Sequence, residues 1–299
     1  MAADDVVFIT GASTGLGLAL AQLLIKKTEH RLVLTARKSS LPRFAEAGID
    51  ASERVMLLPL DVRGMKARED AVAVVAERWG GVDVLINNAG IAYRSVVEHA
   101  HEEDRLEQLD INFRSPMELV RLVLPYMRHQ RYGRIITVSS VGGMMAMPTM
   151  AIYSASKFAV EAATESLWYE VRPWKIRVSL IEPGFIHSGS FQNTRWTPKS
   201  NASITEEEDP YHEHYASMGP FIARMMGLSF ATHERVAKKI LRTMRRNDPP
   251  LRVQATIDAH AFTILRRVLP RWIYHRVLYN SLPRIRKWGP RRPGRKRKP

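Results

Sequence analysis

Short β-rich runs and helix-length segments alternate along most of this 299-residue sequence. The runs are dominated by Val, Ile and Leu, and the segments between them are long enough to form helices of several turns. Parallel strands need a crossover of a dozen or more residues, which a helix usually supplies. The alternation therefore predicts an α/β fold with a single doubly wound parallel sheet of about seven strands and helices on both faces.

The predicted strands are Val6–Thr10, Arg31–Thr35, Val55–Pro59, Asp83–Asn87, Arg134–Ser139, Ile176–Ile181 and Leu251–Ala255. The predicted helices are Gly15–Lys27, Met65–Trp79, Glu103–Gln130, Ile152–Arg172 and His233–Arg246. Ligands of such sheets bind outside the carboxyl ends of the strands. We therefore expect the functional residues in the turns that follow the strands.

A glycine-rich turn, TGASTGLG, connects the first predicted strand to the first predicted helix at residues 10–17. Gly11, Gly15 and Gly17 allow the backbone to turn tightly and to approach a pyrophosphate at a helix N-terminus, where free amides and the dipole favour an anion. The spacing is GxxxGxG, whereas the commonest dinucleotide fingerprint is GxGxxG. Such a turn can be only a loop, but its position between strand and helix favours a nucleotide site.

Tyr153 and Lys157 are four residues apart in a predicted helix, so both side chains lie on one face. A free phenol has a pKa near ~10, and a neighbouring ammonium group favours its ionised form. Tyr153 could then exchange a proton with an alcohol or carbonyl oxygen that a serine of the preceding strand end holds. Taken alone, the pair is weak evidence, because most such pairs in helices are a solvated lysine beside a packed tyrosine.

The order and spacing of these motifs resemble the short-chain dehydrogenase/reductase family, in particular its NADP-preferring hydroxysteroid and retinol dehydrogenase-like members. The resemblance spans about Val6 to Ala255 and rests on TGASTGLG, Asp61-Val62, Asn87-Asn88-Ala89-Gly90, Asn112, Ser140, Tyr153 with Lys157, and Pro183-Gly184. It implies a Rossmann-like catalytic domain at residues 1–257, with a substrate lid at about residues 186–230.

The resemblance implies four catalytic residues, namely Asn112, Ser140, Tyr153 and Lys157. Tyr153 would be the acid/base, and Lys157 would hold the nicotinamide ribose and lower the pKa of the tyrosine. Ser140 would orient the substrate oxygen, and Asn112 would hold a water that links Lys157 to solvent. Ser140 is preferred to Ser139 because the family's serine typically lies thirteen residues before the tyrosine. Asn112 could instead satisfy backbone groups of its own helix.

The implied cofactor-binding residues are Gly11, Ser13, Thr14, Gly15, Leu16, Gly17, Arg37, Asp61, Val62, Asn88, Ala89, Gly90, Tyr153, Lys157, Pro183, Gly184, Ile186 and Ser188. An NAD site needs a carboxylate at the end of the second strand to hold the ribose 2′-hydroxyl. This chain has Thr35-Ala36-Arg37-Lys38 there, and a guanidinium suits a 2′-phosphate. We therefore expect NADP(H), although Arg37 could also be an ordinary surface arginine.

The expected substrate is a bulky or long-chain apolar molecule such as a steroid, a retinoid or a lipid. Methionine-rich surfaces adapt to apolar ligands, and apolar residues are concentrated after Ser140 and in the second half of the lid. They are Met144, Met145, Met147, Met218, Phe221, Ile222, Met225, Met226 and Phe230. The lid helix could instead pack on the body with a methionine core. Family members commonly form homodimers or homotetramers through the helices predicted here at residues 103–130 and 152–172.

The net charge of +15 belongs to the C-terminal end, because residues 259–299 hold 13 Lys/Arg and no Asp/Glu. We predict an amphipathic helical extension at residues 258–282, divided in two by Pro270, and a basic, disordered tail at residues 283–299. A basic amphipathic helix with aromatic residues can lie in an anionic membrane interface. It can equally dock on its own domain or on a partner subunit.

The absence of cysteine excludes disulfides and thiolate chemistry, and no metal site is expected. No long uncharged apolar run and no signal peptide are evident, so we expect a cytoplasmic protein with at most peripheral membrane contact and no nucleic-acid partner. The predicted function is an NADP(H)-dependent oxidoreductase that interconverts a carbonyl and an alcohol. The alternative is a nucleotide-sensing binding protein on the same fold, with a basic tail for a partner, nucleic acid or membrane.

Overall fold

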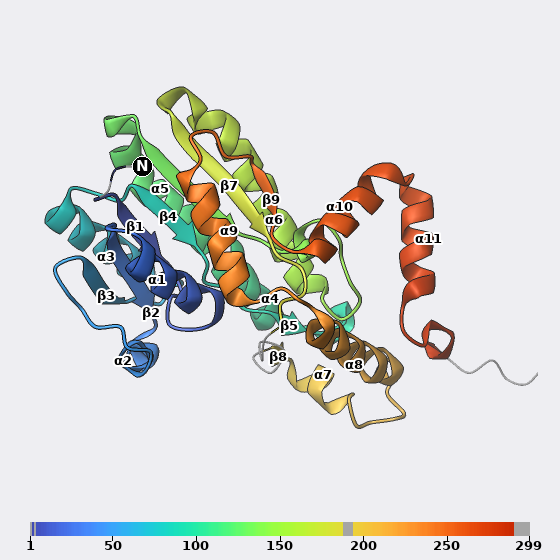
Figure 1. Ribbon diagram of the computed structural model, residues 1–299. Helices are drawn as coiled ribbons and strands as arrows, with labels where there is room; N and C mark the ends of the chain where they lie inside the picture. Colours follow the sequence, from blue (N-terminus) through green and yellow to red (C-terminus); the bar gives the residue numbers. More distant parts are fainter. Residues whose placement is uncertain (1, 3, 188–193, 290–299) are drawn as a thin grey trace, which may run out of the picture.

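The main sheet has seven parallel strands, as the alternation predicted (Figure 1). The computed structural model describes residues 2, 4–187 and 194–289. The strands are β1 Val6–Ile9, β2 Arg31–Ala36, β3 Val55–Pro59, β4 Val84–Asn87, β6 Gly133–Val138, β7 Ile176–Glu182 and β9 Arg252–Gln254. Their spatial order is β3-β2-β1-β4-β6-β7-β9. The chain thus moves outward from β1 to β3 and returns to the other side of β1 at β4, which creates a switch point between β1 and β4.

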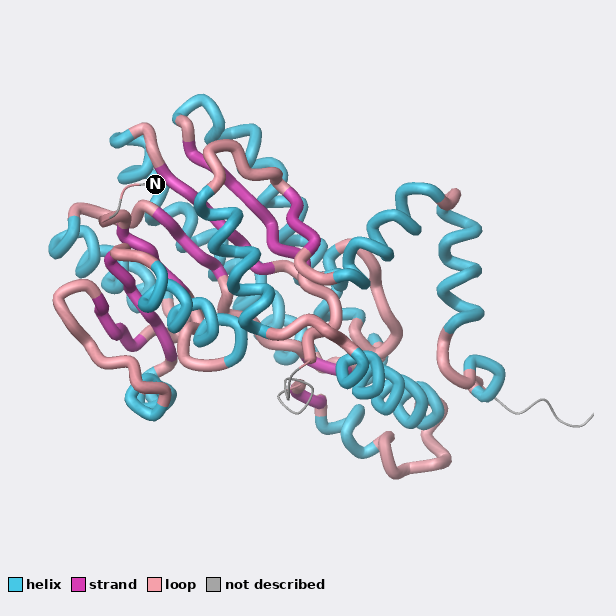
Figure 2. Tube along the Cα trace, viewed as in Figure 1, coloured by secondary structure: helices cyan, strands magenta, loops and turns pink. Residues whose placement is uncertain are grey.

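Helices cover both faces of this sheet (Figure 2). One face carries α1 (Gly15–Lys27) and α9 (His233–Arg245), whose apolar side chains join those of β1 and β2 in one buried cluster. The opposite face carries α3 (Met65–Trp79), α5 (Ser115–Gln130) and α6 (Ala151–Val171), which contribute to a second buried cluster. The sheet is therefore buried on both sides, as its uniformly apolar strands require.

The prediction of one continuous helix at Glu103–Gln130 is wrong. The chain forms α4 (Glu102–Leu109), then a π-helical turn at Asp110–Arg114, and then α5. Pro116 has no backbone N–H to offer the carbonyl of Asn112 four residues earlier, so an ordinary helical hydrogen bond cannot form there. The wider turn places Asn112 at the interruption, a position at which π-helical turns often carry functional residues.

The described residues of the predicted lid, 186–187 and 194–230, form short elements and one longer helix next to the loop after β4. β5 (Tyr93–Arg94) pairs in parallel with β8 (Arg195–Trp196), and the short α7 (Pro198–Ala202) and α8 (His212–Leu228) follow. The remaining short helix, α2 (Pro42–Glu46), lies beyond β2. Neither strand of the small sheet was predicted, because a two-residue strand has no recognisable alternation.

The C-terminal extension is helical, as predicted, and Pro270 separates α10 (Ile257–Val268) from α11 (Arg271–Ser281). These two helices, called here the C-terminal arm, lie at one end of the molecule (Figure 1). Their inner face packs on the body, where Tyr274 is buried against Met144 and Met145. Docking on its own domain, one of the three expected alternatives, therefore accounts for the inner face of the arm.

The chain beyond the arm differs from the prediction of disorder from residue 283. A 3-10 turn forms at Ile285–Lys287, and the Trp288 ring packs against His214 of α8 with 4.3 Å between ring centroids. A single large aromatic side chain thus anchors a segment whose composition is otherwise basic. The last ten residues of the predicted tail, 290–299, lie outside the described residues.

Candidate active site

A cavity of about 750 Å³ lies at the carboxyl ends of the central strands. The predicted site residues that line it are Thr14, Leu16, Arg37, Asn88, Gly90, Ser140, Tyr153, Lys157, Pro183, Gly184 and Ile186. Gly11, Ser13, Gly15, Gly17, Asp61, Val62, Ala89 and Asn112 are not among the lining residues and belong to the turns and elements around them. Ser188 lies outside the described residues. The structure thus brings together residues that are far apart in the sequence.

The glycine turn has the geometry that an anion site requires. Gly11 and Gly15 adopt positive φ angles of +63° and +54°, a region that favours glycine. A Cβ atom at Gly17 would lie 2.3 Å from the carbonyl oxygen of Gly11, so only glycine fits there. Thr14, the N-cap of α1, makes no side-chain cap, which leaves the first-turn amides to bind a pyrophosphate.

The glycine turn is fastened to the loop after β4 across the switch point. The Thr10 hydroxyl accepts hydrogen bonds from the backbone N–H groups of Asn88 (2.9 Å) and Ala89 (3.0 Å). In return the Asn88 side-chain amide donates to the carbonyl oxygens of Thr10 (2.9 Å) and Gly11 (3.0 Å). Asn88 therefore fixes the shape of the glycine turn in addition to lining the cavity.

Tyr153 lies against the turn that carries Ser140. The Ser140 hydroxyl accepts a hydrogen bond from the backbone N–H of Gly142 (3.1 Å), and a Cβ atom at Gly142 would lie 2.8 Å from the Tyr153 ring. Glycine at position 142 thus allows the ring to approach Ser140. Burial raises the pKa of the Tyr153 phenol, and hydrogen bonding with Ser140 lowers it only in part. The expected lowering of this pKa by Lys157 is therefore not found in the protein alone.

Lys157 is buried beside Tyr153, with its ammonium nitrogen 5.9 Å from the centre of the tyrosine ring. The ammonium donates a hydrogen bond to the carbonyl oxygen of Val138 at the end of β6 (2.9 Å). Burial lowers the pKa of Lys157 to about 8, and the negative charge of Glu161 opposes that shift. Lys157 is consequently a cation at neutral pH, but one that is easily deprotonated.

Asn112 connects the segments on either side of Lys157 through side-chain hydrogen bonds. Its side-chain oxygen accepts a hydrogen bond from the backbone N–H of Ile91 (2.9 Å), and its amide donates to the Ile91 carbonyl oxygen (2.9 Å) and to Ser156 (3.0 Å). These contacts tie the loop after β4 to α6 near Lys157. Asn112 thus satisfies backbone groups of the loop after β4 and not those of its own helix, and the water-holding role stays a prediction.

An ionic cluster behind the cavity was not predicted. The Ser139 hydroxyl donates a hydrogen bond to buried Glu161 (2.5 Å). Arg252 of β9 donates to Glu161 (2.5 Å), to Glu182 (2.7 Å) and to Glu165 (2.8 Å). Glu161 follows Lys157 by one helical turn, so the spacing in the sequence could have predicted that Glu161 lies near the ammonium group.

Two exposed arginines lie at the cavity edge beyond β2. Arg37 was predicted to bind the 2′-phosphate, whereas Arg43 of α2 was not, because nothing in the sequence indicated that the chain turns back toward the cavity. The pKa of Asp61 is lowered chiefly by its hydrogen bonds with Arg63, and the positive charge of Arg37 lowers it further. The predicted adenine contact and the predicted phosphate ligand are therefore close enough to interact.

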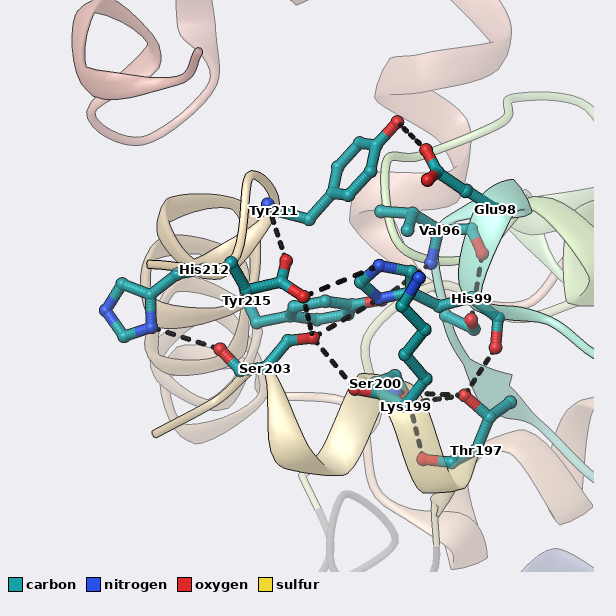
Figure 3. A network of polar contacts seen from close by, with 12 residues as sticks. Val96, Glu98, His99, Thr197, Lys199, Ser200, Ser203, Tyr211, His212 and Tyr215 are labelled. Carbon is teal, nitrogen blue, oxygen red and sulfur yellow. Dashed lines mark hydrogen bonds and ion pairs between the residues drawn. The ribbon is translucent and has the colours of Figure 1, made fainter. Parts of the chain in front are cut away.

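A buried polar network anchors the lid to the chain that follows β5 (Figure 3). The Tyr215 hydroxyl of α8 accepts a hydrogen bond from the backbone N–H of Val96 (3.0 Å) and contacts the His99 ring nitrogen (3.1 Å). Thr197 donates to the His99 carbonyl oxygen (2.7 Å), and Asp209 lies 3.7 Å from the other ring nitrogen of His99. Across residues 2, 4–187 and 194–289, no cluster of three or more His, Cys, Asp or Glu is arranged to hold a metal.

The lid and the loop after Ser140 form an apolar wall of the cavity. Its members are Met145, Met147, Met150, Phe185, Ile222 and Met226. Of the other apolar residues expected to border the substrate, Met218 is buried in the lid and Phe230 is exposed. Met144 and Met145 also contact the C-terminal arm. The wall thus agrees in part with the expected apolar pocket.

The chain is similar in sequence and in structure to several known proteins. A family profile described as short chain dehydrogenase matches residues 5–199. A 3-ketodihydrosphingosine reductase of Bacteroides thetaiotaomicron is 36% identical over 71% of this chain and 73% of its own length. A probable NADP-dependent dehydrogenase of Haemophilus influenzae is 33% identical over 63% of this chain and 74% of its own. The crystal structure of a short-chain dehydrogenase from Streptomyces avermitilis superposes with a TM-score of 0.73 and 25% identity, covering 93% and 99% of the two chains.

The buried ammonium of Lys157 makes stability depend on pH in a defined direction. Between about pH 8 and 10.5, the unfolded chain still binds the proton that the folded protein has lost. The stability of the wild-type protein relative to Lys157→Met should therefore rise across this window, by up to roughly 3 kcal/mol. Urea unfolding at pH 7, 9 and 10.5 measures the difference. Lys238→Met, at an exposed position of α9, is the control, and a pH-independent difference for Lys157→Met would contradict the account.

Proposed function

Because this chain belongs to the short-chain dehydrogenase/reductase family, we propose that it is an NADP(H)-dependent oxidoreductase that interconverts a carbonyl and an alcohol. The proposed substrate is a bulky or long-chain apolar molecule, in keeping with the methionine-rich wall. The observation that carries the proposal is the convergence of Ser140, Tyr153 and Lys157 on the same cavity as the glycine turn.

The residues present fit a nicotinamide dinucleotide. The glycine turn and the free amides of α1 would hold the pyrophosphate, Gly90 and Gly184 would border the nicotinamide side, and Arg37 with Arg43 would hold a 2′-phosphate. The bound dinucleotide supplies or accepts a hydride. The similarity to a probable NADP-dependent dehydrogenase supports the same cofactor.

The protein's own contribution is the handling of one proton. Tyr153 is a neutral phenol at neutral pH, as any phenol with an ordinary pKa is, and burial raises its pKa further. It is therefore ready to donate a proton to a carbonyl oxygen during reduction. Ser140 would hold that oxygen by a second hydrogen bond. Lys157 places a positive charge near the phenolate that remains, which stabilises it. In the opposite direction the phenol must first lose its proton, so higher pH favours oxidation.

The alternative of a nucleotide-sensing protein is less well supported, because binding alone needs no phenol, hydroxyl and ammonium converging on one cavity. The relative from Bacteroides thetaiotaomicron is named for a long-chain ketone, which makes long-chain ketones the first substrates to test. Self-association through α5 and α6 stays a prediction.

Replacement of Tyr153 by Phe removes only the hydroxyl. We expect the NADPH-dependent reduction of a long-chain ketone to fall by a factor of about 10² to 10⁴, while NADPH binding changes less than about threefold. Loss of NADPH absorbance measures turnover, and fluorescence titration measures binding. Tyr169→Phe, at an exposed position of α6, is the matched control. A Tyr153→Phe enzyme with wild-type turnover would refute the assigned role.

Removal of either cationic side chain beyond β2 should weaken the binding of NADPH but not that of NADH. We expect Arg37→Gln and Arg43→Gln each to raise the KM for NADPH by about tenfold, since each removes a charge-assisted hydrogen bond to the 2′-phosphate. The KM for NADH should stay within about twofold, because NADH lacks that phosphate. Lys38→Gln serves as the control, since exposed Lys38 adjoins Arg37 without lining the cavity. Equal effects on both cofactors would count against NADP(H) preference.

We further propose that the C-terminal arm contacts an anionic membrane surface. Its outer face exposes large apolar side chains, including Ile257, Ile264, Val268 and Trp272 (61–80% exposed). Arg266, Arg267, Arg271 and Arg276 lie on the same two helices. Apolar and cationic side chains together suit an anionic interface. Within the described residues, no helix has the length and apolar character to span a bilayer.

Vesicle flotation tests the arm as a membrane contact. The wild-type protein should float with vesicles that contain anionic phospholipid and not with neutral ones, since both charge and apolar area are needed. The double variant Ile264→Asp/Val268→Asp should lose flotation, whereas Tyr169→Asp, at an exposed position of α6, should keep it. Flotation that survives deletion of residues 258–299 would exclude the arm as the anchor.

A further inference from the structure

The C-terminal arm begins beside the candidate active site. β7 and β9 are parallel neighbours, so their carboxyl ends meet at one edge of the sheet, and α10 begins beside that edge (Figure 1). Residues 183–185, called here the β7 loop, follow β7 and line the cavity. The first residues of the arm therefore lie next to a loop that borders the proposed nicotinamide side of the cavity.

Two side chains at the start of the arm hold the backbone of the β7 loop. The Thr256 hydroxyl, at the N-cap of α10, accepts a hydrogen bond from the backbone N–H of Gly184 (2.9 Å). A carboxylate oxygen of Asp258 accepts one from the backbone N–H of Phe185 (2.8 Å). Thr256 and Asp258 lie outside residues 5–199, which the family profile matches. The family profile therefore does not account for these contacts.

Gly184 leaves room for the Asp258 side chain. A Cβ atom at position 184 would lie 1.9 Å from a carboxylate oxygen of Asp258 and 2.5 Å from its carboxyl carbon. With alanine at this position, the Asp258 side chain would have to leave the rotamer that reaches the Phe185 amide. Asp258 thus requires a glycine at position 184, for a reason that is independent of the cofactor.

The β7 loop connects the arm to two walls of the cavity. The Pro183 carbonyl oxygen accepts a hydrogen bond from the backbone N–H of Val141 (2.8 Å), the residue that follows Ser140. The Phe185 carbonyl oxygen accepts one from the Ser229 hydroxyl at the end of the lid (2.5 Å). The position of the β7 loop therefore affects both the Ser140 turn and the lid.

We propose that Asp258 is a positioning residue of this active site. By holding the Phe185 amide it fixes the β7 loop, and the loop in turn fixes the Ser140 hydroxyl that would orient the substrate oxygen. A displacement of about 1 Å at a reacting centre can lower a rate by a factor of about 10², so a single hydrogen bond outside the cavity is enough to affect turnover. The inference rests on the proposed function for the reaction and adds to it a role for the C-terminal arm.

Hydrogen exchange of single amides, followed by NMR, tests the contact without turnover. In the full-length wild-type protein the amides of Phe185 and Val141 should be protected, because each donates a hydrogen bond. In Asp258→Ala both should exchange at least about tenfold faster, that of Val141 because the β7 loop is released. Asp258→Asn keeps a side-chain oxygen as acceptor and should restore most of the protection. His260→Ala, at an exposed position of the same helix, is the control and should change neither amide.

Kinetic constants separate positioning from a merely structural role. We expect Asp258→Ala to lower kcat for reduction of a long-chain ketone by about tenfold and to leave the KM for NADPH within about twofold, because the phosphates would bind away from the β7 loop. Asp258→Asn should keep kcat within about threefold of the wild type. Gly184→Ala should resemble Asp258→Ala, and the double variant should fall no further, since both changes remove the same hydrogen bond. A wild-type kcat in Asp258→Ala, or a loss in the double variant equal to the product of the two single losses, would contradict the inference.

The outcomes also separate this inference from the proposed function. A wild-type protein that reduces no ketone with NADPH would refute the proposed function, and the exchange of the Val141 amide would still decide whether Asp258 holds the Ser140 turn. A protein that reduces ketones but whose Val141 amide exchanges equally fast with and without the Asp258 carboxylate would keep the function and overturn the inference. Should Asp258→Ala fail to fold, Gly184→Ala, which displaces the carboxylate without removing it, gives the same two readouts.

Discussion

The rest of the site depends on the burial of one positive charge, the ammonium group of Lys157. Removing such a charge from water costs several kcal/mol, and the fold offsets part of that cost with the Val138 carbonyl oxygen and the nearby charge of Glu161. Arg252 in turn neutralises Glu161 and its neighbouring carboxylates. The cluster behind the sheet thus keeps a cation in place beside a phenol that burial holds in its neutral form. Tyr153 and Lys157, buried side by side, contribute little to the stability of the fold. Buried titratable groups with shifted pKa values are typical of functional sites.

Sheet topology explains why so many distant residues reach this pair. The strand order reverses between β1 and β4, so the turns after both strands open on the same crevice. Thr10 and Asn88 fasten the two turns to each other, and the lid closes the far side through the network around Tyr215 (Figure 3). The cavity is therefore held in shape by hydrogen bonds between polar side chains and the backbone of neighbouring loops.

Sequence reasoning recovered the strands to within about one residue, because they depend on local patterns of apolar residues. It also placed Tyr153 and Lys157 together on one cavity, because their helical spacing is fixed. It missed features that depend on long-range contact. The pairing of β5 with β8, the return of Arg43 to the cavity and the contact of Asp258 with the β7 loop all follow from tertiary packing. Two misses had local signals, since Pro116 marked the interruption of the long helix and Trp288 marked an anchor in the basic tail. The pKa of Tyr153 was misjudged because burial, which the sequence does not reveal, raises it by more than the hydrogen bond with Ser140 lowers it.

The account rests on where a dinucleotide sits relative to this pair, and a crystal structure of the protein with NADP⁺ measures that directly. The predicted result has the pyrophosphate at the glycine turn, the ribose hydroxyls in contact with Lys157, and the nicotinamide ring beside the Tyr153 hydroxyl. A dinucleotide whose nicotinamide lies away from Tyr153 and Ser140, or one that binds outside this cavity, would contradict the account.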